Sequence, residues 1–354
     1  MTSIREVAER SGVSVSTVSR VFNGYDDVSQ ATRERVLASA QALDYAPSAA
    51  ARTLVTQRSQ VVGVVLYTGD EHPDIHHPFF QGVLVGLKRG IGALGYDLLL
   101  FATEQPGANH GREHSYLRRA RQHRVDGIVL MGVDRADPEV EKLVRSPIPV
   151  IGVDLDVAGS RSSYVTSDNV GGARLAVRHL HELGHTRIAT IAGPQRTRPG
   201  ADRLLGYRAE VRALGLAADN ALEFEGDFYS ESGGAGMRQL LELTERPTAV
   251  FVASDLMAVG AIRAAQGAGL RIPGDLAVVG FDDIQLAELV DPPLTTIRQD
   301  SVGIGVAAGR ALVEQIENPD VTPPVLTLPV ELIVRASSGA ATGGGDDGRQ
   351  SAAT

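Results

Sequence analysis

Apolar and polar positions alternate along the first 45 residues at the spacing of three short helices. Apolar stripes recur three or four residues apart in three groups: Ile4, Val7 and Ala8; Val18, Val21 and Phe22; Val36, Ala40 and Leu43. Ser3 with Glu6 has capping-box spacing, Ser14 is the expected cap of the second helix, and the third begins after Ser29. Two short helices joined by a tight turn containing glycine make the helix-turn-helix pattern.

From residue 61 the pattern changes to short β-rich runs that alternate with longer helical ones. Ten runs have the length and composition of strands: 61–67, 96–101, 126–131, 149–154, 163–168, 187–193, 222–228, 248–254, 276–282 and 294–299. Helices are expected between them, including 80–94, 169–183, 201–214, 255–268 and 301–317. This alternation indicates doubly wound parallel sheets covered by helices, and its length favours two α/β lobes over one.

Composition narrows the class of protein. The 354 residues allow more than one domain, and 43% apolar with 22% charged residues are ordinary for a soluble globular protein. The chain has no Cys, which excludes disulfides and thiolate metal sites and fits a reducing compartment. The first residues lack the apolar core of a signal peptide, and the longest apolar run, 61–67, is too short to span a bilayer. We therefore expect a cytoplasmic protein without contact to a membrane.

Charge is distributed unevenly along the chain. The net charge is −9, but residues 1–60 hold seven arginines and six acids, which gives +1 and leaves −10 for the remainder. A near-neutral head on an acidic body permits local contact with DNA while phosphate repels the body.

The second helix of a helix-turn-helix enters the major groove with its N-terminal residues against the base edges. With Val18, Val21 and Phe22 turned inward, the outward residues of 15–23 are Val15, Ser16, Ser19 and Arg20. An arginine can bond two acceptors of a guanine, a serine suits several bases, and valine suits a thymine methyl. Thr17 and Ser19 suit phosphate. The alternative is a helical hairpin packed on the body without DNA.

The stretch "TSIREVAERSGVSVSTVSRVFNG…VSQATRERVLASAQALDYAPSAAARTL" resembles the DNA-binding head of the LacI/GalR family of bacterial repressors. The resemblance continues through "RVDGIVLMG", "TSDNVGGARLAVRHLHELGH", "RPTAVFVASDLMAVGAIRAAQGAGLRIPGDLAVVGFDD" and "PPLTTIRQD", and so covers nearly the whole chain. It implies a helix-turn-helix head, a hinge helix, and a two-lobed body like a type I periplasmic sugar-binding protein. DNA contacts are then expected from Val15, Ser16, Thr17, Ser19, Arg20, Asn23, Ala51 and Leu54.

The hinge is the stretch "PSAAARTLV" at 47–55, which is about two helical turns long. Such a short helix is marginal in water by itself. The resemblance implies that two copies fold side by side in the minor groove when a dimer docks, with Leu54 as a wedge between base steps. Ala49, Ala50 and Ala51 are small enough for the two copies to approach closely. An inert linker would more often use Gly, Ser or charged residues.

Ligands of open α/β sheets bind beyond the carboxyl ends of the strands. The residues at these ends are Tyr67, Met131, Asp154, Asp168, Gly193, Ser254 with Asp255, and Asp282 with Asp283. Carboxylates suit the paired hydroxyls of a sugar. The alternative for Asp168, Asp255 and Asp283 is a helix N-cap, since each precedes a helical run.

The resemblance assigns roles to several of these positions. Arg203 matches the arginine that anchors the effector, and Asp282 matches the main carboxylate of the pocket. Asp168 and Ser254 fall on further pocket positions, with Asp255 as the cap, and aromatic walls are expected at Phe79, Phe80 and Phe228. Core packing is the alternative for one of Phe79 and Phe80. The effector site is thus expected to comprise Phe79, Phe80, Met131, Asp168, Arg203, Phe228, Ser254 and Asp282.

Two loops depart from the family pattern. Arg196 and Arg198 in "PQRTRPGADR" could serve an anionic effector such as a sugar phosphate. The loop "GDEHPDIHHPFF" is rich in His and acids, but its spacing matches no metal site, so a solvated loop is the better interpretation of His72, His76 and His77.

These observations predict a homodimeric repressor that binds a palindromic operator and is controlled by a small molecule, most simply a sugar, with no metal or cofactor. The alternatives are a purine or sugar-phosphate effector, or a small-molecule binding or transport protein. An enzyme is not expected, since phosphate-binding, dinucleotide and nucleophile-elbow motifs are absent. The predicted domains are a head at 1–46, hinge and linker at 47–59, a two-lobed body at 60–336 and a disordered tail at 337–354. Lobe 1 is predicted at about 60–162 with 295–325, and lobe 2 at about 163–294 with 326–336.

Overall fold

The computed structural model describes residues 2–22, 24–45, 58–66, 74–101, 115–134, 136–157 and 159–339. Asn23, the hinge stretch with Ala51 and Leu54, and Tyr67 lie outside the described residues, so the predictions on them stay predictions. The contacts divide the chain into two compact units. One comprises Met1–Val61 with His123–Asp126, and the other comprises the rest of the chain.

The first unit contains the three predicted helices, α1 (Ile4–Ser11), α2 (Val15–Phe22) and α3 (Gln30–Ala42). Each begins where the sequence predicts. Ser3 and Glu6 form the complete capping box, the Ser14 hydroxyl accepts from the Thr17 N–H at 3.1 Å, and Ser29 caps α3. Gly12 ends α1 in the left-handed region with φ 66°, which glycine adopts without steric cost.

The core of the head is built from the predicted apolar stripes. Its buried residues are Val7, Ala8, Val18, Val21, Val36 and Ala40. Phe22 packs against this cluster from the side, and its ring meets that of Tyr45 edge-on at 5.8 Å. The outward face of α2 is therefore left to the residues that were predicted to contact DNA.

The second unit contains two six-stranded sheets, one in each lobe. Sheet A has the order β11-β5-β4-β3-β1-β2, with strands Leu326–Leu328, Ser162–Ser167, Val150–Val153, Gly127–Met131, Val61–Leu66 and Asp97–Phe101. Sheet B has the order β12-β10-β9-β8-β6-β7, with strands Val330–Ile333, Thr295–Gln299, Ala277–Asp282, Ala249–Val252, Ile188–Ala192 and Glu223–Glu225. In sheet A the strands from β11 to β1 run parallel, and in sheet B all strands run parallel except β12, which is antiparallel to β10. All ten predicted strands are present, whereas β11 and β12 were not predicted.

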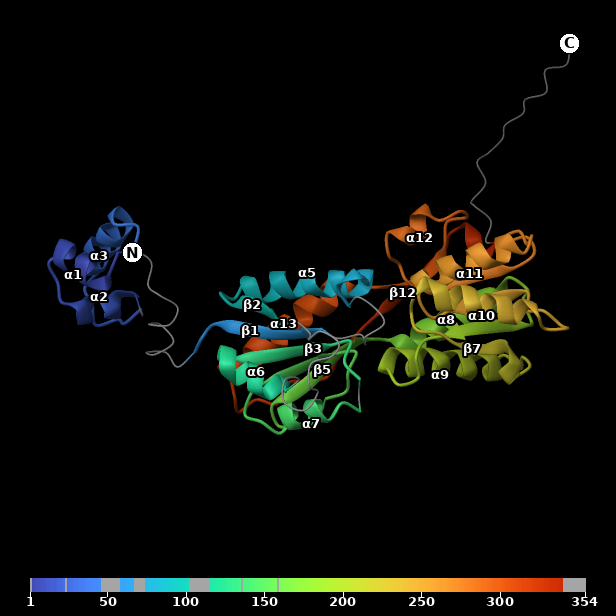
Figure 1. The fold of residues 1–354 in the computed structure, drawn as a ribbon, viewed down its shortest axis with the longest axis horizontal. Helices are drawn as coiled ribbons and strands as arrows, with labels where there is room; N and C mark the ends of the chain where they lie inside the picture. The colour runs from blue at the N-terminus through green and yellow to red at the C-terminus, as the bar shows by residue number, and fades with distance from the viewer. Residues whose placement is uncertain are drawn as a thin grey trace, which may run out of the picture. The chain divides into compact units, whose positions relative to one another are not determined.

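Helices cover both faces of sheet A (Figure 1). One face carries α5 (Pro78–Gly92) and α13 (Ser301–Glu317), and the other carries α6 (Tyr116–His123) and α7 (Pro138–Val144). The first two helices pack closely because Gly86 has no side chain. A Cβ atom built at Gly86 would lie 2.1 Å from the carbonyl oxygen of Val302. A short 3₁₀ turn, η1 (Asp74–His76), precedes α5.

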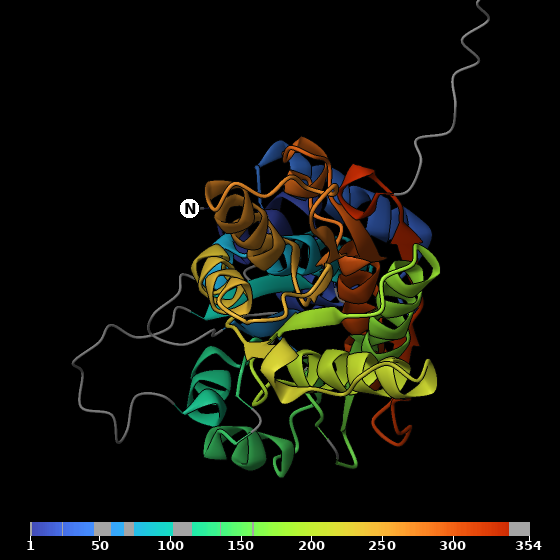
Figure 2. The same ribbon diagram turned by 90° about the vertical axis from the view of Figure 1, so that its right-hand side faces the viewer.

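Sheet B is likewise covered on both faces, as the two views agree (Figures 1 and 2). Alternate residues of its strands enter two separate cores: Val250 and Val252 pack under α10 (Ser230–Leu241) and α11 (Asp255–Gly267). Ala249 and Phe251 pack under α8 (Asn169–Glu182) and α9 (Arg198–Ala213). A short helix, α12 (Leu286–Leu289), and the 3₁₀ turn η2 (Asn220–Leu222) complete this lobe. None of the helices described is both long and apolar enough to cross a membrane.

The limits of the lobes differ from those predicted. Strand β5, Ser162–Ser167, belongs to sheet A, whereas it was placed in lobe 2 from residue 163. Strand β10 belongs to sheet B and β11 to sheet A, each opposite to the prediction. The chain therefore crosses between lobes after Ser167, after Gln299 and after Leu328. A strand followed by a helix has the same apolar pattern whether or not the chain changes sheets, so the sequence does not mark these crossings.

The tail begins later than predicted. Ser337 and Ser338, placed in a disordered tail from 337, lie in the 3₁₀ turn η3 (Ala336–Ser338) and are buried. The Ser337 hydroxyl donates to the Val278 carbonyl at 2.6 Å and accepts from the Thr295 N–H at 2.8 Å. These serines are small enough to enter the interior. The backbone of β9 and β10 satisfies the Ser337 hydroxyl, and the side chains of Thr295 and His179 lie 2.9 Å from the Ser338 hydroxyl. Residues 340–354 lie outside the described part of the chain.

Candidate functional site

A cavity of about 320 Å³ lies between the two lobes of the second unit. The elements of sheet A contribute His77, Phe79, Phe80 and Asp154, and those of sheet B contribute Arg203, Phe228 and Asp282. The aspartates stand at the carboxyl ends of β4 and β9, which is where ligands of parallel sheets bind. Of the eight residues predicted to form the effector site, five line this cavity: Phe79, Phe80, Arg203, Phe228 and Asp282.

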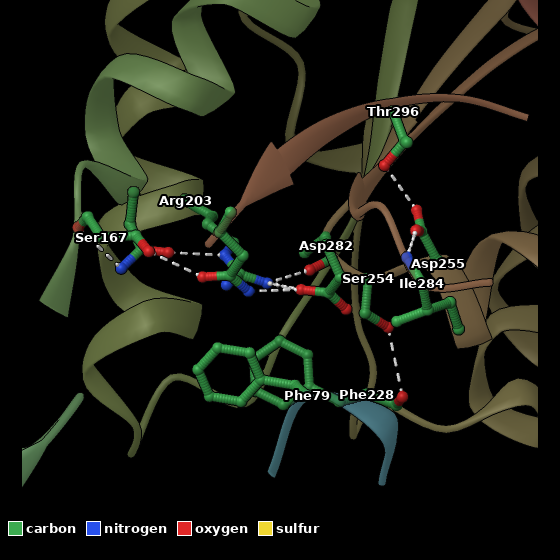
Figure 3. Close-up of polar contacts among 12 residues, drawn as sticks. Phe79, Ser167, Arg203, Phe228, Ser254, Asp255, Asp282, Ile284 and Thr296 are labelled. Atoms are coloured by element: carbon green, nitrogen blue, oxygen red, sulfur yellow. Dashed lines mark hydrogen bonds and ion pairs between the residues drawn. The ribbon is translucent and has the colours of Figure 1, made fainter. Parts of the chain in front are cut away.

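Arg203 is the buried cation of the cavity. Its Nε donates to Asn169 Oδ1 at 2.8 Å, and its Nη1 donates to the Ala253 carbonyl at 2.6 Å. Its guanidinium lies 3.7 Å from the centre of the Phe281 ring. Figure 3 shows Arg203 and Asp282 pointing toward each other, with Nη1 3.5 Å from Oδ1. Burial lowers the pKa of Arg203, and the carboxylates of Asp282 and Asp154 oppose this change.

Asp282 is the buried carboxylate opposite this arginine. Burial raises its pKa to about 6, although the Arg203 charge and the hydrogen bond from Gln299 favour the ionised form. Gln299 Nε2 donates to Oδ1 at 2.6 Å, whereas Oδ2 has no hydrogen-bond partner among the described residues. The backbone of Asp282 has φ 123°, a conformation that side chains rarely adopt. A strained backbone and a buried acceptor without a partner are both typical of a binding site.

Neither Ser254 nor Asp255 has the role that was predicted for it. Ser254 is the N-cap of α11, since its hydroxyl accepts from the Met257 N–H at 3.2 Å, and it donates to the Phe228 carbonyl. Asp255 is not the cap. Its carboxylate accepts from the Thr296 hydroxyl at 2.6 Å and from the Ile284 N–H at 3.0 Å, and Figure 3 shows it turned toward both groups. Neither residue is among those that line the cavity.

Met131 and Asp168 are also outside the lining. Met131 is fully buried in the core beneath α5 and α13, because it ends β3 on the inward side of the pleat. Asp168 is exposed, and its carboxylate accepts from the Gly171 N–H at 2.8 Å, so it is the N-cap of α8. This is the alternative role given above for an aspartate that precedes a helix. Asp283 caps no helix, because its carboxylate pairs with Arg298 and Arg335.

The aromatic residues form the apolar part of the cavity. Phe79 and Phe80 meet edge-on at 5.4 Å, and Phe79 is also part of the sheet A core. Phe228 has φ 74°, and its ring lies 5.6 Å from the Arg203 guanidinium. Phenyl rings beside a buried ion pair give the mixed surface that the apolar faces and hydroxyls of a sugar require.

His77 was predicted to lie in a solvated loop, but it is buried and lines the cavity. Its Nδ1 accepts from the Phe79 N–H at 3.3 Å and so caps α5. Burial and the Arg203 charge lower its pKa to about 4, although the Phe228 carbonyl favours the charged form. The imidazole is therefore neutral at physiological pH. His72 is outside the described residues, among which no group of three His, Cys, Asp or Glu could hold a metal.

Arg196 and Arg198 both line the cavity, as binding of an anionic effector would require. Each of them, however, already lies beside a carboxylate of the protein. Arg198 is bonded to Asp156 and, at 3.1 Å, to Asp202. Arg196 Nε lies 4.0 Å from an oxygen of Asp134.

Several residues that line the cavity were not among those predicted to form the effector site. Asp154 was recognised at a strand end but was not included, although its carboxylate lines the cavity and accepts from Thr166 at 2.6 Å. Gln299 lines the cavity and also ends a strand, and this position at a strand end was the only feature of the sequence that could have indicated a binding role. Asp134, Asp227 and Tyr229 lie in loops, where nothing in the sequence marks them.

The head carries a second candidate site on α2. Val15, Ser16 and Arg20 are exposed, while Thr17 and Ser19 are half-buried. Arg20 is held by an ion pair of 2.7 Å with Asp27, and its guanidinium lies 5.9 Å from the Tyr25 ring centre. The helix thus presents polar groups and one oriented arginine on a single face, as a recognition helix does.

Comparison with known proteins matches both parts of the chain. Residues 3–48 match the family described as bacterial regulatory proteins, lacI family, and residues 177–338 match the periplasmic binding protein-like domain. The chain is 42% identical over 333 residues to the HTH-type transcriptional regulator CelR of Thermobifida fusca, covering 94% of this chain and 96% of CelR.

Two solved structures extend the comparison. The transcriptional regulator CelR–cellobiose complex has a TM-score of 0.73 at 39% identity, covering 95% of this chain and 100% of that one. The lac repressor dimer bound to operator and the anti-inducer ONPF has a TM-score of 0.81 at 30% identity, covering 96% and 99%. With a helix-turn-helix head, a two-lobed body and relatives matched over nearly its whole length, the chain belongs to the LacI family of bacterial regulatory proteins.

Proposed function

We propose that this chain is a transcriptional repressor that binds a palindromic operator as a homodimer and is controlled by a neutral carbohydrate bound between its lobes. A repressor meets its operator in the bacterial cytoplasm, so this is where the chain would act. Its relatives are transcriptional regulators, which supports a regulatory rather than an enzymatic role.

The observation that carries the carbohydrate proposal is the buried Asp282 carboxylate. Its Oδ2 has no partner among the described residues, and three phenylalanines line the same cavity. A buried carboxylate oxygen without a donor is costly, and a sugar hydroxyl can supply the missing hydrogen bond. The cavity volume of about 320 Å³ falls at the small end of the range for ligand pockets, which suits a mono- or disaccharide.

The charge of the lining favours a neutral effector over a sugar phosphate. The lining contains four carboxylates, of Asp134, Asp154, Asp227 and Asp282, and three guanidinium groups, which gives a net charge of −1 when all are ionised. His77 adds no charge at neutral pH because its pKa is about 4. A phosphate would add two further negative charges to a surface that is already slightly negative.

Effector and operator are coupled through the arrangement of the lobes. Each ligand favours one arrangement, so each changes the affinity of the other by the same factor, typically about 1–3 kcal/mol. On the DNA side, α2 would contact base edges through Val15, Ser16 and Arg20 and phosphate through Thr17 and Ser19. The hinge would contribute Ala51 and Leu54, for which the support is the sequence resemblance.

The test is isothermal titration of the full chain with cellobiose, glucose, ribose, glucose 6-phosphate and hypoxanthine. Cellobiose comes first because the solved CelR complex contains it. We expect a neutral sugar to bind and to change retention of a palindromic duplex in a gel-shift assay. A ligand at about 100 times its Kd should also add about 2.7 kcal/mol to native stability.

Two outcomes would contradict this proposal in different ways. Binding of hypoxanthine or glucose 6-phosphate without any neutral sugar would replace the carbohydrate by a purine or a phosphate. Sugar binding without retention of any duplex would instead favour a small-molecule binding protein.

A further inference from the structure

We propose that Asp134 and Asp156 are specificity-determining residues, because they hold two cavity arginines in ion pairs between the lobes and thereby exclude anionic effectors. This inference rests on the proposed function of the cavity as an effector site. It concerns the loop at 194–197 with the first residue of α9, and the two loops that follow β3 and β4.

Arg198 is the more firmly held of the two arginines. It is the first residue of α9, beside sheet B, but its Nη1 donates to Asp156, which follows β4 of sheet A. Its Nε donates to Asp202 at 3.1 Å, one turn further along the same helix. The guanidinium also lies 4.7 Å from the centre of the Tyr164 ring of β5. Three groups therefore orient this cation, and two of them come from the opposite lobe.

Arg196 repeats this arrangement more loosely. Its Nε lies 4.0 Å from Asp134 Oδ2, and the side chains are 63% and 42% exposed. Asp134 follows β3 of sheet A, so this pair also joins the two lobes. Both arginines and Asp134 belong to the lining of the cavity. Each pair includes an arginine of the lining, so its charges act on whatever occupies the cavity.

A phosphorylated ligand would need these arginines as partners, since Arg203 already donates to Asn169 and the Ala253 carbonyl and lies beside Asp282. It would have to displace Asp134 and Asp156 and leave both carboxylates unpaired beside its own charge. A neutral sugar meets no such penalty, because its hydroxyls can bond to the arginines without removing their carboxylate partners. Specificity therefore comes from a cost imposed on the wrong ligand as well as from contacts to the right one.

The test is the double variant Asp134→Asn, Asp156→Asn, titrated with glucose 6-phosphate and with cellobiose. The amides keep the size of the side chains but remove two negative charges. We expect glucose 6-phosphate to bind the variant at least about tenfold more tightly than it binds the native chain, since one new charge-assisted hydrogen bond is enough for this factor. The gain should shrink as ionic strength rises.

The matched control is the double variant Glu223→Gln, Asp275→Asn. It removes two carboxylates that also pair with arginines, Arg208 and Arg271, but neither lies in the lining. It changes the net charge equally and should leave affinity for glucose 6-phosphate unchanged. An equal gain in this control would show a general charge effect and overturn the inference.

The remaining outcomes separate this inference from the proposed function. Tight binding of glucose 6-phosphate by the native chain, or no gain in the folded variant, would overturn the inference while sugar binding stood. A gain for the phosphate in a chain that binds no neutral sugar would support the inference and refute the carbohydrate proposal. The single variant Asp156→Asn gives the same test at Arg198 alone if the double variant does not fold.

Discussion

Affinity for a neutral sugar should depend on pH through Asp282. Its pKa in the unliganded cavity is raised to about 6 by burial, and the ionised form is the one that accepts a hydrogen bond from a sugar hydroxyl. About one tenth of the carboxyl groups are ionised at pH 5 and nearly all at pH 7.5, so the Kd should rise about tenfold between pH 7.5 and pH 5. Isothermal titration in buffers of equal ionic strength measures this change.

The stability of the unliganded chain should change in the opposite direction. A carboxyl group with a raised folded-state pKa retains its proton between about pH 4 and pH 6 while the unfolded chain has lost it. Native stability from this group therefore falls as pH rises through that window, whereas sugar affinity rises. Thermal unfolding without ligand, measured across the same buffers, thus separates the titration of Asp282 from acid unfolding.

The variant Asp282→Asn tests whether Asp282 is the titrating group that causes the pH dependence of sugar affinity. It should weaken sugar binding by about 1.5–3 kcal/mol, the value of a hydrogen bond to a charged group, and should abolish the pH dependence. His77 is neutral throughout this range because its pKa is about 4. Burial also raises the pKa of Asp255, which lies behind the cavity wall. Burial likewise raises the pKa of Asp154, which lines the cavity. A pH dependence that persists in the variant would assign the titration to Asp154 or Asp255, and a Kd constant from pH 5 to 7.5 would refute the argument.

Three further substitutions test the two units separately. Arg203→Ala should abolish the response to effector and spare operator affinity in a gel shift; the reverse result would move the effector site elsewhere. Arg20→Ala should weaken operator binding by about 1–3 kcal/mol and leave the sugar Kd unchanged; an unaltered base preference in a binding-site selection would remove Arg20 from base recognition. Ser337→Ala should cost about 1–3 kcal/mol in urea unfolding, because it leaves the Thr295 N–H without its acceptor. No loss of stability would mean that the last turn is not anchored by this serine.

Local chemistry made the head predictable from its sequence. The capping pairs at Ser3 and Ser14 and the stripe containing Val18 act within a few residues, so helix limits and inward faces follow from spacing alone. The same holds for central strands such as β3, β8 and β9, because their apolar runs are buried on both faces of a parallel sheet, whereas the edge strands β2 and β7 are partly exposed.

The candidate site was predictable only in part. Arg203 and Asp282 line the cavity as the family resemblance implied, whereas Met131 turned to the core. Ser254 and Asp168 were correctly placed at strand ends, but both cap the next helix instead of facing the cavity. A side chain at a strand end can do either. A position along the sequence does not distinguish these directions.

By itself the sequence determined the three helices of the head, ten of the strands, five of the helices between them and the order of the two units, because backbone preference and apolar spacing act locally. Tertiary structure alone decided which sheet received β5, β10 and β11, why Ser337 is ordered, and that Arg198 pairs with Asp156. It also buried His77 in the cavity lining rather than leaving it in solvent. Each of these features joins residues far apart in the chain, and burial and charge pairing depend on distance in space, which local patterns do not encode.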